Sequence, residues 1–247
     1  MTDANTLRFN AEALSWDSNP DVQQATRLAH EAYLAYLSPA DDDLHSPALS
    51  TLDVLDLGCG TGLLSLALAP SVRSVTAVDA ADGMIDALQS KLSSGEHKNV
   101  RAVCALLESG DDERVGIDPV TGEKWTDANK GFDVVVSHLV LHHIPDLAAL
   151  FKTVHECLRP GGRVVVTDFE NFGPEARRFH PESKMDGVER HGIERGEIQG
   201  LLEGAGFGEV KVETAFELEK KVETEPGSGV MEREMVFPFL ICEGRKC

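Results

Sequence analysis

An apolar segment in the first third of the chain ends in an acid followed by glycines at alternate positions. This segment, VLDLGCGTG, covers residues 54–62, and Asp79 closes the next apolar run, VTAVD. Glycines permit dihedral angles that other residues avoid and let a ligand lie against the main chain. A carboxylate at the end of the following strand can accept hydrogen bonds from both hydroxyls of a ribose. The pairing therefore predicts a nucleoside-binding strand–helix–strand unit.

The spacing within this loop indicates which kind of nucleoside it binds. Residues 52–57 read as a buried parallel strand and residues 61–69 as an amphipathic helix, so the glycines lie in the turn between them. A dinucleotide fingerprint, G-x-G-x-x-G, requires its third glycine where this chain has Leu63, and Asp56 precedes the first glycine where such enzymes carry an apolar residue. A carboxylate there favours a ligand with a cationic amino group and repels a pyrophosphate. An NAD-dependent oxidoreductase is an alternative only if its loop tolerates both residues.

The elements that must position this loop form a cap, residues 1–50, and a core, residues 51–247, within one structural domain. Asn19 and Pro20 predict the start of a helix that runs to about Leu37. The apolar face expected for this helix carries Val22, Ala25, Leu28, Ala29, Ala32 and Tyr36.

Three segments are predicted to be irregular. The acidic stretch at residues 41–47 is interpreted as a linker, and residues 105–131 as a surface insertion with a small hairpin around Thr121 and Gly122. Residues 169–192 are interpreted as a lid over a partly apolar small molecule, or as a packed loop that never touches substrate. The side chains expected at the mouth of the pocket are Phe9, Trp16, Phe169, Phe172, Phe179, His180, Met185 and His191.

The last part of the chain returns to a regular pattern. It predicts a helix from Glu194 to about Glu203, a strand from about Glu209 and a last strand over residues 235–244. Pro238 lacks a backbone donor, so we expect a bulge or a local break there.

The pattern D-x-G-x-G-x-G followed by a strand-ending acid resembles motifs I and II of the class I S-adenosylmethionine (AdoMet) dependent methyltransferases. Further along, residues 132–146, 158–169 and 201–213 resemble the later strands and the last helix of that family, so the likeness covers roughly residues 50–215. The branch it resembles is the small-molecule one of ubiquinone and menaquinone biosynthesis. The resemblance implies a Rossmann-like α/β fold with a seven-stranded sheet of order 3-2-1-4-5-7-6, strand 7 antiparallel, and helices on both faces. It also implies AdoMet as cofactor and S-adenosylhomocysteine as its product.

The resemblance further implies a set of cofactor-binding residues. Asp56 and the glycine loop are expected to hold the methionine part, and Asp79 the ribose. The implied set is Asp56, Gly58, Cys59, Gly60, Asp79, Ala80, Met84, Leu106, Leu107, Ser137 and His138.

The adenine pocket departs from the family pattern. Leu106 and Leu107 stand where the family carries an acid that binds the adenine amine. Either Glu108 takes that role or the backbone at the two leucines does. Met84 is either an adenine-stacking residue or ordinary core packing.

Histidines gather after the fourth predicted strand, where the methyl group is expected. A base helps if the acceptor is a hydroxyl or a thiol, and histidine has a suitable pKa. His138 and His142 are therefore candidates either for a catalytic base or for shaping the pocket. No metal site is predicted, although zinc bound by these two with His180 or His191 is a further alternative.

Composition excludes several kinds of partner. The formal net charge of −19 over 247 residues argues against nucleic acid and anionic membranes. There is no apolar stretch long enough to span a membrane and no secretory signal, so a cytoplasmic protein is expected. The cysteines show no metal-ligand spacing and are expected to be reduced thiols: Cys59, Cys104, Cys157, Cys242 and Cys247.

Two function hypotheses follow from these observations. The first is an AdoMet-dependent methyltransferase that acts on a small-molecule acceptor by in-line displacement. The second is a catalytically silent binder of AdoMet or S-adenosylhomocysteine that works through protein contacts. The sequence leaves the acceptor atom and the oligomeric state open.

Overall fold

The computed structural model describes residues 3–38, 47–126 and 130–247. The linker predicted at residues 41–47 lies outside the described residues except for its last one. The helices are α1 (Asp3–Trp16), α2 (Pro20–Leu37), α3 (Leu63–Leu68), α4 (Asp82–Leu92), α5 (Leu147–Cys157) and α6 (Arg195–Gly204), with short 3-10 helices η1 (Leu49–Thr51), η2 (Leu141–His143), η3 (Pro174–Phe179) and η4 (Glu182–Lys184).

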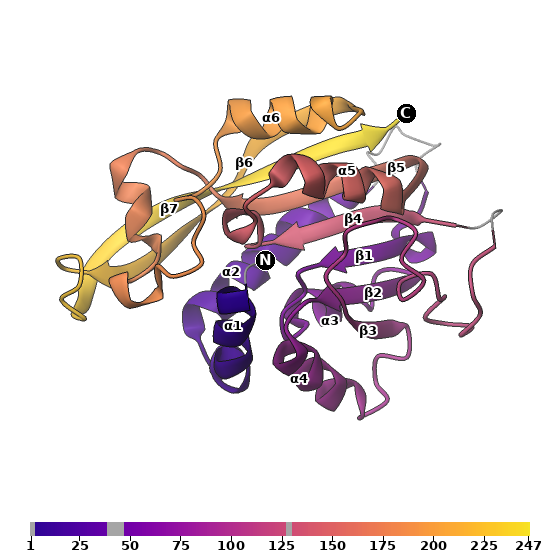
Figure 1. Ribbon diagram of the computed structural model, residues 1–247, viewed down its shortest axis with the longest axis horizontal. Helices are drawn as coiled ribbons and strands as arrows, with labels where there is room; N and C mark the ends of the chain where they lie inside the picture. Colours follow the sequence, from indigo (N-terminus) through magenta and orange to yellow (C-terminus); the bar gives the residue numbers. More distant parts are fainter. Residues whose placement is uncertain (1–2, 39–46, 127–129) are drawn as a thin grey trace.

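A seven-stranded sheet forms the centre of the molecule (Figure 1). Its strands are β1 (Asp53–Leu57), β2 (Ser74–Asp79), β3 (Val100–Cys104), β4 (Phe132–His138), β5 (Leu158–Phe169), β6 (Phe207–Glu223) and β7 (Met231–Lys246). The order is β3-β2-β1-β4-β5-β7-β6, and β7 is antiparallel to both of its neighbours. The predicted fold and strand order are confirmed.

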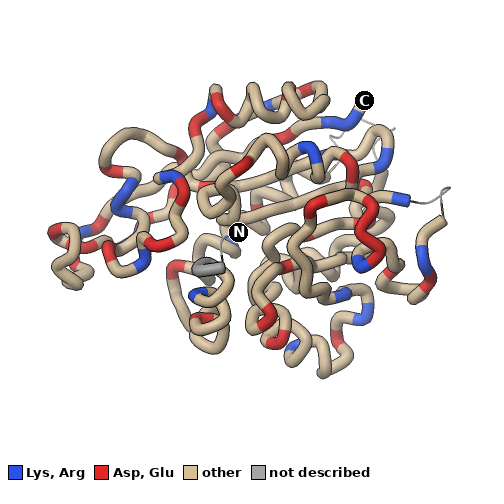
Figure 2. The backbone as a smooth tube through the Cα atoms, in the orientation of Figure 1, with Lys and Arg blue, Asp and Glu red and all other residues tan. Residues whose placement is uncertain are grey.

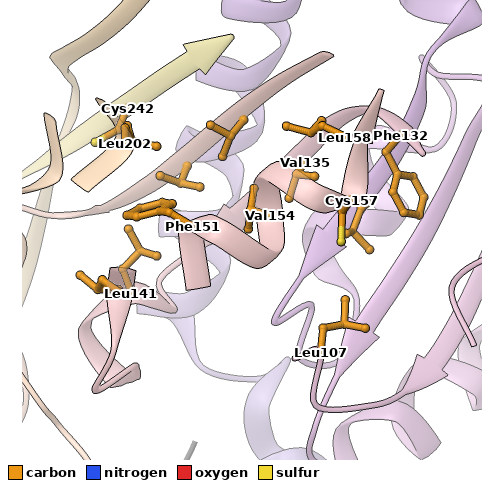
Figure 3. Close-up of a cluster of buried hydrophobic side chains, with 14 of the residues drawn as sticks. Leu107, Phe132, Val135, Leu141, Phe151, Val154, Cys157, Leu158, Leu202 and Cys242 are labelled. Atoms are coloured by element: carbon orange, nitrogen blue, oxygen red, sulfur yellow. The ribbon is translucent and has the colours of Figure 1, made fainter. Parts of the chain in front are cut away.

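Helices cover both faces because successive side chains of a strand point to opposite sides of the sheet. On β4, Val134 and Val136 belong to the core that α2, α3 and α4 cover, and Val135 belongs to the core under α5 and α6. Figure 3 shows the second of these cores, with Phe151, Val154 and other α5 side chains against the strands.

Helix α2 begins and ends where the sequence predicts. Asn19 is its cap, and the side-chain oxygen accepts a hydrogen bond from the backbone N–H of Asp21 at 3.0 Å. The predicted apolar face is wrong in part, because the buried stripe is Ala25, Ala29, Tyr33 and Leu37. Tyr33 lies against the sheet, since its hydroxyl donates to the carbonyl of Ser137 at 2.6 Å. Because this contact holds Tyr33 against the sheet, the buried face of α2 contains Tyr33 in place of the predicted Tyr36.

Helix α1 is not predicted by the sequence pattern. It packs on the start of α4, where the side-chain oxygen of Asn10 accepts a hydrogen bond from the N–H of Gly83 at 2.9 Å. The amide of Asn10 donates to Asp82. The helix is thereby fixed beside the carboxyl edge of the sheet.

The carboxyl-terminal hairpin of β6 and β7 extends from the sheet to one end of the molecule (Figure 1). The predicted break at Pro238 is wrong, because β7 continues through this residue and pairs it with Glu217. Backbone N–H and C=O groups of one strand residue point the same way, and the carbonyl of Pro238 accepts from Glu170, which follows the end of β5. The missing N–H of Pro238 would therefore face away from β6, and no hydrogen bond between β6 and β7 is lost. A register shift occurs instead in β6, between Thr214 and Phe216.

In the predicted insertion, Ile117 and Lys124 form an isolated antiparallel bridge. The turn between them includes Thr121 and Gly122, as the sequence predicts. Elsewhere acidic positions are spread over the whole length of the fold rather than gathered on one element (Figure 2). No helix within the described residues has both the length and the hydropathy that a membrane crossing needs.

Candidate functional site

A cavity of about 330 Å³ opens at the carboxyl edge of the sheet. Both helices of the cap, the glycine loop, β4, the segment after β5 and the carboxyl-terminal hairpin contribute to its wall. The lining includes Arg8, Phe9, Trp16, Asp21, Val22, Asp56, Gly58, Cys59, Gly60, Thr61, Asp79, Met84, His138, Leu139, Val140, His142, His143, Phe179, His180, Lys184, Leu218 and Lys220. The cavity therefore joins the nucleoside-binding motif to the histidines.

Asp79 holds the glycine loop in place. One carboxylate oxygen accepts a hydrogen bond from the N–H of Gly60 at 2.9 Å, and the other accepts from Ala81 at 2.8 Å. Burial raises the pKa of Asp79, and these backbone donors offset part of that shift. A carboxylate has about four lone-pair directions, so acceptor capacity is left for a ligand in the cavity.

Gly60 forms a cradle in this loop. Its φ is 53°, which favours glycine, and a Cβ built there would lie 3.9 Å from Nε1 of Trp16 and 4.0 Å from Sδ of Met84. Met84 also packs with Ala13 and Phe9 in a small buried cluster, as the core-packing alternative expects, and adenine stacking by this residue stays a prediction. A flat group can lie over the bare backbone between the tryptophan and the methionine.

Asp56 is a buried carboxylate without a cation. It is 1% exposed, accepts a hydrogen bond from the hydroxyl of Ser65 at 2.5 Å, and takes part in no ion pair among the described residues. Burial raises the pKa of Asp56 to about 7, and nearby Asp79 adds to the shift. A ligand that brings a positive charge into this part of the cavity would stabilise the ionised carboxylate.

His138 ends a chain of hydrogen bonds that fixes its protonation. The single proton of the Tyr33 hydroxyl goes to the carbonyl of Ser137, so the 3.1 Å contact between Tyr33 and Thr167 uses the proton of the threonine. Oγ1 of Thr167 must then accept from Nδ1 of His138, at 2.8 Å. Nε2 of His138 is left as a buried acceptor without a hydrogen-bond partner. Burial lowers the pKa of His138 to about 4, so the ring is neutral.

The backbone turns sharply after His138. Leu139 adopts a φ of 58°, in the left-handed region that a leucine rarely occupies. Its N–H donates to the carbonyl of Thr167 at 2.9 Å, which stabilises the turn. Strained residues of this kind cluster at functional sites, and this one lines the cavity.

A second histidine is bonded to a buried acid. Nδ1 of His142 lies 2.9 Å from each carboxylate oxygen of Asp168, and Nε2 of His142 is buried without a partner. Burial alone would raise the pKa of Asp168, but the hydrogen bonds that it accepts from the ring and backbone of His142 and from the backbone of Phe169 lower it overall.

Two further histidines lie beside this pair. Nδ1 of His143 lies 2.8 Å from the carbonyl of Gly187, and burial lowers the pKa of His143 to about 3. Burial also places the pKa of His180 well below its usual value. One nitrogen from each of His142, His143 and His180 lies within 4.8 Å of the others. His138 and His191 are not part of this group.

Some predicted site residues lie outside the cavity wall. Ala80, Leu106 and Leu107 are not among its lining residues, and Glu108 is exposed. Ser137 is buried, and its hydroxyl donates to the carbonyl of Leu57 at 2.7 Å. Their contribution to binding therefore stays a prediction. Of the side chains predicted for residues 169–192, Phe179 and His180 line the cavity.

Several lining residues are missed by sequence reasoning. Arg8, Lys184 and Lys220 line the cavity, where Lys184 pairs with Glu12 at 3.0 Å and Lys220 pairs with Asp21 at 3.4 Å. Nζ of Lys220 lies 4.4 Å above the ring of Phe179 and donates to its carbonyl at 2.9 Å. These cations come from three distant parts of the chain, so no local pattern shows that they converge.

The comparisons with known proteins agree with this geometry. The fold and the glycine loop define a Rossmann-like nucleoside-binding domain. A family model described as a methyltransferase domain matches residues 23–212, so the chain belongs to the methyltransferase domain family. Membership confirms the predicted class, the AdoMet-dependent methyltransferases.

Individual relatives are distant. The chain is 31% identical over 191 residues to an uncharacterized methyltransferase of Schizosaccharomyces pombe, which covers 74% of this chain and 64% of that protein. It is 35% identical over 129 residues to a ubiquinone biosynthesis O-methyltransferase of Pseudomonas aeruginosa, covering 51% of this chain and 47% of that protein. The chain thus spans between about half and two thirds of the length of these relatives.

A solved structure shows the same fold over nearly the whole chain. The complex of DhpI with S-adenosylhomocysteine superposes with a TM-score of 0.60 at 21% identity, covering 99% of this chain and 96% of that one.

Proposed function

We propose that this chain transfers a methyl group from AdoMet to a small-molecule acceptor bound in the described cavity. The observation that carries this proposal is that one cavity joins the glycine loop and Asp79 to His138. AdoMet supplies an electrophilic sulfonium methyl group when it is bound. The protein then has to align the acceptor with that methyl group and exclude water.

The residues present fit this cofactor. The bare backbone at Gly60 leaves room for it between Trp16 and Met84. Asp56 lacks a cation, and the ammonium of the methionine part provides one. Asp79 retains lone pairs for the ribose hydroxyls. These roles extend the predicted set of cofactor residues and include Trp16.

His138 is the residue that we assign to the acceptor's proton. Its ring is neutral, and the chain through Thr167 and Tyr33 keeps the hydrogen on Nδ1. Nε2 can therefore accept a hydrogen bond from an acceptor hydroxyl or thiol and take its proton as the methyl group is transferred.

The cavity wall indicates the character of the acceptor. Phe9, Phe179 and Leu218 supply apolar contact, and Lys220 is paired with Asp21 at 3.4 Å. A small, partly apolar molecule with a hydroxyl or thiol fits such a wall best. We also infer a cytoplasmic location, which the free cysteines of the structure support.

The proposal is tested by following label from methyl-tritiated AdoMet into a panel of hydroxylated, thiol and amine compounds. We expect transfer to at least one oxygen or sulfur acceptor. His138→Gln should lower kcat by about 10² or more. His97→Gln, which changes a histidine outside the cavity, is the control. Binding of AdoMet with no transfer to any compound would favour the silent binder instead.

A further inference from the structure

Three histidines from two segments meet in the wall of the cavity. His142 and His143 form the end of η2, and His180 follows η3. The ring centroid of His142 lies 3.9 Å from that of His143 and 5.0 Å from that of His180. One nitrogen from each ring lies within 4.8 Å of the other two. All three residues line the cavity.

The hydrogen bonds of two of these rings leave Nε2 free to bind a ligand. The carboxylate of Asp168 accepts backbone hydrogen bonds from His142 and Phe169, so it accepts the Nδ1 hydrogen of His142 as well. The carbonyl of Gly187 can only accept, so Nδ1 of His143 also carries a hydrogen. Metal-binding histidines are oriented in this way, by a carboxylate or a carbonyl on the opposite nitrogen.

One of these free nitrogens lacks the hydrogen bond that a buried acceptor requires. Nε2 of His142 is buried and has no hydrogen-bond partner. A buried acceptor without a partner costs about 1–3 kcal/mol. A cation bound between the three rings would remove that cost.

The donor set selects the kind of cation. Three neutral imidazoles suit zinc and similar borderline metals, whereas magnesium and calcium require oxygen ligands. Zinc–nitrogen bonds of about 2.0–2.1 Å bring tetrahedral ligand atoms to roughly 3.4 Å from one another. The three nitrogen atoms, which lie within 4.8 Å of one another, would therefore have to approach by up to about 1.4 Å when a cation binds.

We propose that His142, His143 and His180 bind one divalent cation of the zinc class and leave a coordination position open to the cavity. Three protein ligands with one open position are typical of catalytic rather than structural zinc sites. The binding of the cation does not depend on methyl transfer. Its use does rest on the proposed function: the open position would hold the oxygen or sulfur of the acceptor and favour its deprotonated form.

The test is a titration of the chelator-treated protein with cobalt(II), followed by its visible absorption. We expect one equivalent to bind with the strong absorption of a four- or five-coordinate site, and zinc to displace it. His180→Gln and His143→Gln should each weaken binding at least about 10-fold. His191→Gln is the matched control, because this histidine lies in the same segment outside the group, and it should bind as the wild type does.

Calorimetric titration of AdoMet into the same variants separates this proposal from the proposed function. Retained AdoMet binding in His180→Gln and His143→Gln shows that the fold is intact, so lost cobalt binding then supports the site. Absence of stoichiometric cobalt binding in the wild type would overturn it. Equal binding in the wild type and both variants would also overturn it. Cobalt binding without AdoMet binding would support the metal site and count against the methyltransferase proposal alone.

Discussion

The carboxylate of Asp79 accepts a hydrogen bond from the backbone N–H of Gly60 at 2.9 Å. The acid at the end of β2 and the glycine loop after β1 are therefore one bonded unit. Gly60 has a positive φ, and a Cβ there would reach ordinary contact distance of two cavity side chains, so the bare backbone is open to the cavity.

Gly60→Ala should weaken AdoMet binding at least about 10-fold, because its Cβ enters the cradle. The positive φ should also lower the free energy of unfolding by about 1 kcal/mol. Gly95→Ala is the control, since Gly95 has a φ of 76° and nothing within 4 Å of its Cβ position. Calorimetry and urea denaturation measure the two effects. Equal AdoMet affinities in the two variants would show that no ligand occupies the cradle.

Asp56 should make AdoMet binding release protons. Its pKa of about 7 is lowered when an ammonium group approaches, so binding at pH 6.5 should release up to about one proton. Calorimetry in buffers of different ionisation enthalpy measures this release. Asp56→Asn should bind AdoMet more weakly and release none. Proton release unchanged in that variant would assign it to another group.

The same carboxyl group should make the stability of the ligand-free protein depend on pH. The pKa of Asp56 is raised in the folded state, so its stabilising effect is complete below about pH 4 and is lost as the pH rises through about 7. The difference in urea midpoint between the wild type and Asp56→Asn should therefore change over this interval. A constant difference between pH 4 and pH 8 would contradict the raised pKa.

Tyr33→Phe should disturb the protonation of His138. Without the tyrosine hydroxyl, Thr167 can donate to Nδ1, and the ring can carry its hydrogen on Nε2 instead. Nitrogen NMR of the imidazole should show this tautomer change, kcat should fall, and AdoMet affinity should hold. Tyr36→Phe on the same helix is the control, because that hydroxyl donates to Glu213. Identical imidazole spectra in the two variants would refute the hydrogen-bond chain.

Phe239→Ala should lower the free energy of unfolding by about 3–5 kcal/mol. The ring is fully buried and stacks on Phe216 with centroids 4.7 Å apart. Val236→Ala, on the same strand but 48% exposed, should change it by about 0.5 kcal/mol or less. Urea denaturation gives both values. Similar losses would mean that Phe239 is not part of a packed core.

Local patterns predict much of the fold. The apolar runs that become β1 and β2 are predicted directly, since a strand buried on both faces needs apolar residues nearly throughout. Asn19 and Pro20 give the start of α2 because capping is a local interaction. The buried face of that helix is less predictable, because Tyr33 owes its place to a carbonyl 104 positions away.

The sequence predicts only the part of the candidate site that the glycine loop and Asp79 form. These residues are close in sequence, and their types and spacing make a recognisable motif. The partner of His142 is Asp168, 26 positions later, and that pairing follows from the register of β4 and β5 rather than from a motif. Helix α1 and Lys220 also reach the cavity through packing between distant segments, which a single sequence does not encode as a pattern.

Titration of AdoMet and S-adenosylhomocysteine into the wild type and Asp79→Ala tests the central claim most directly. The account predicts that the wild type binds both ligands. Asp79→Ala should lose about 2 kcal/mol of binding free energy, roughly 30-fold in affinity, because a charged acceptor of the ribose hydroxyls is removed. Asp86→Ala, an exposed acid of α4, should bind as the wild type does. Failure of the wild type to bind either ligand would contradict the account.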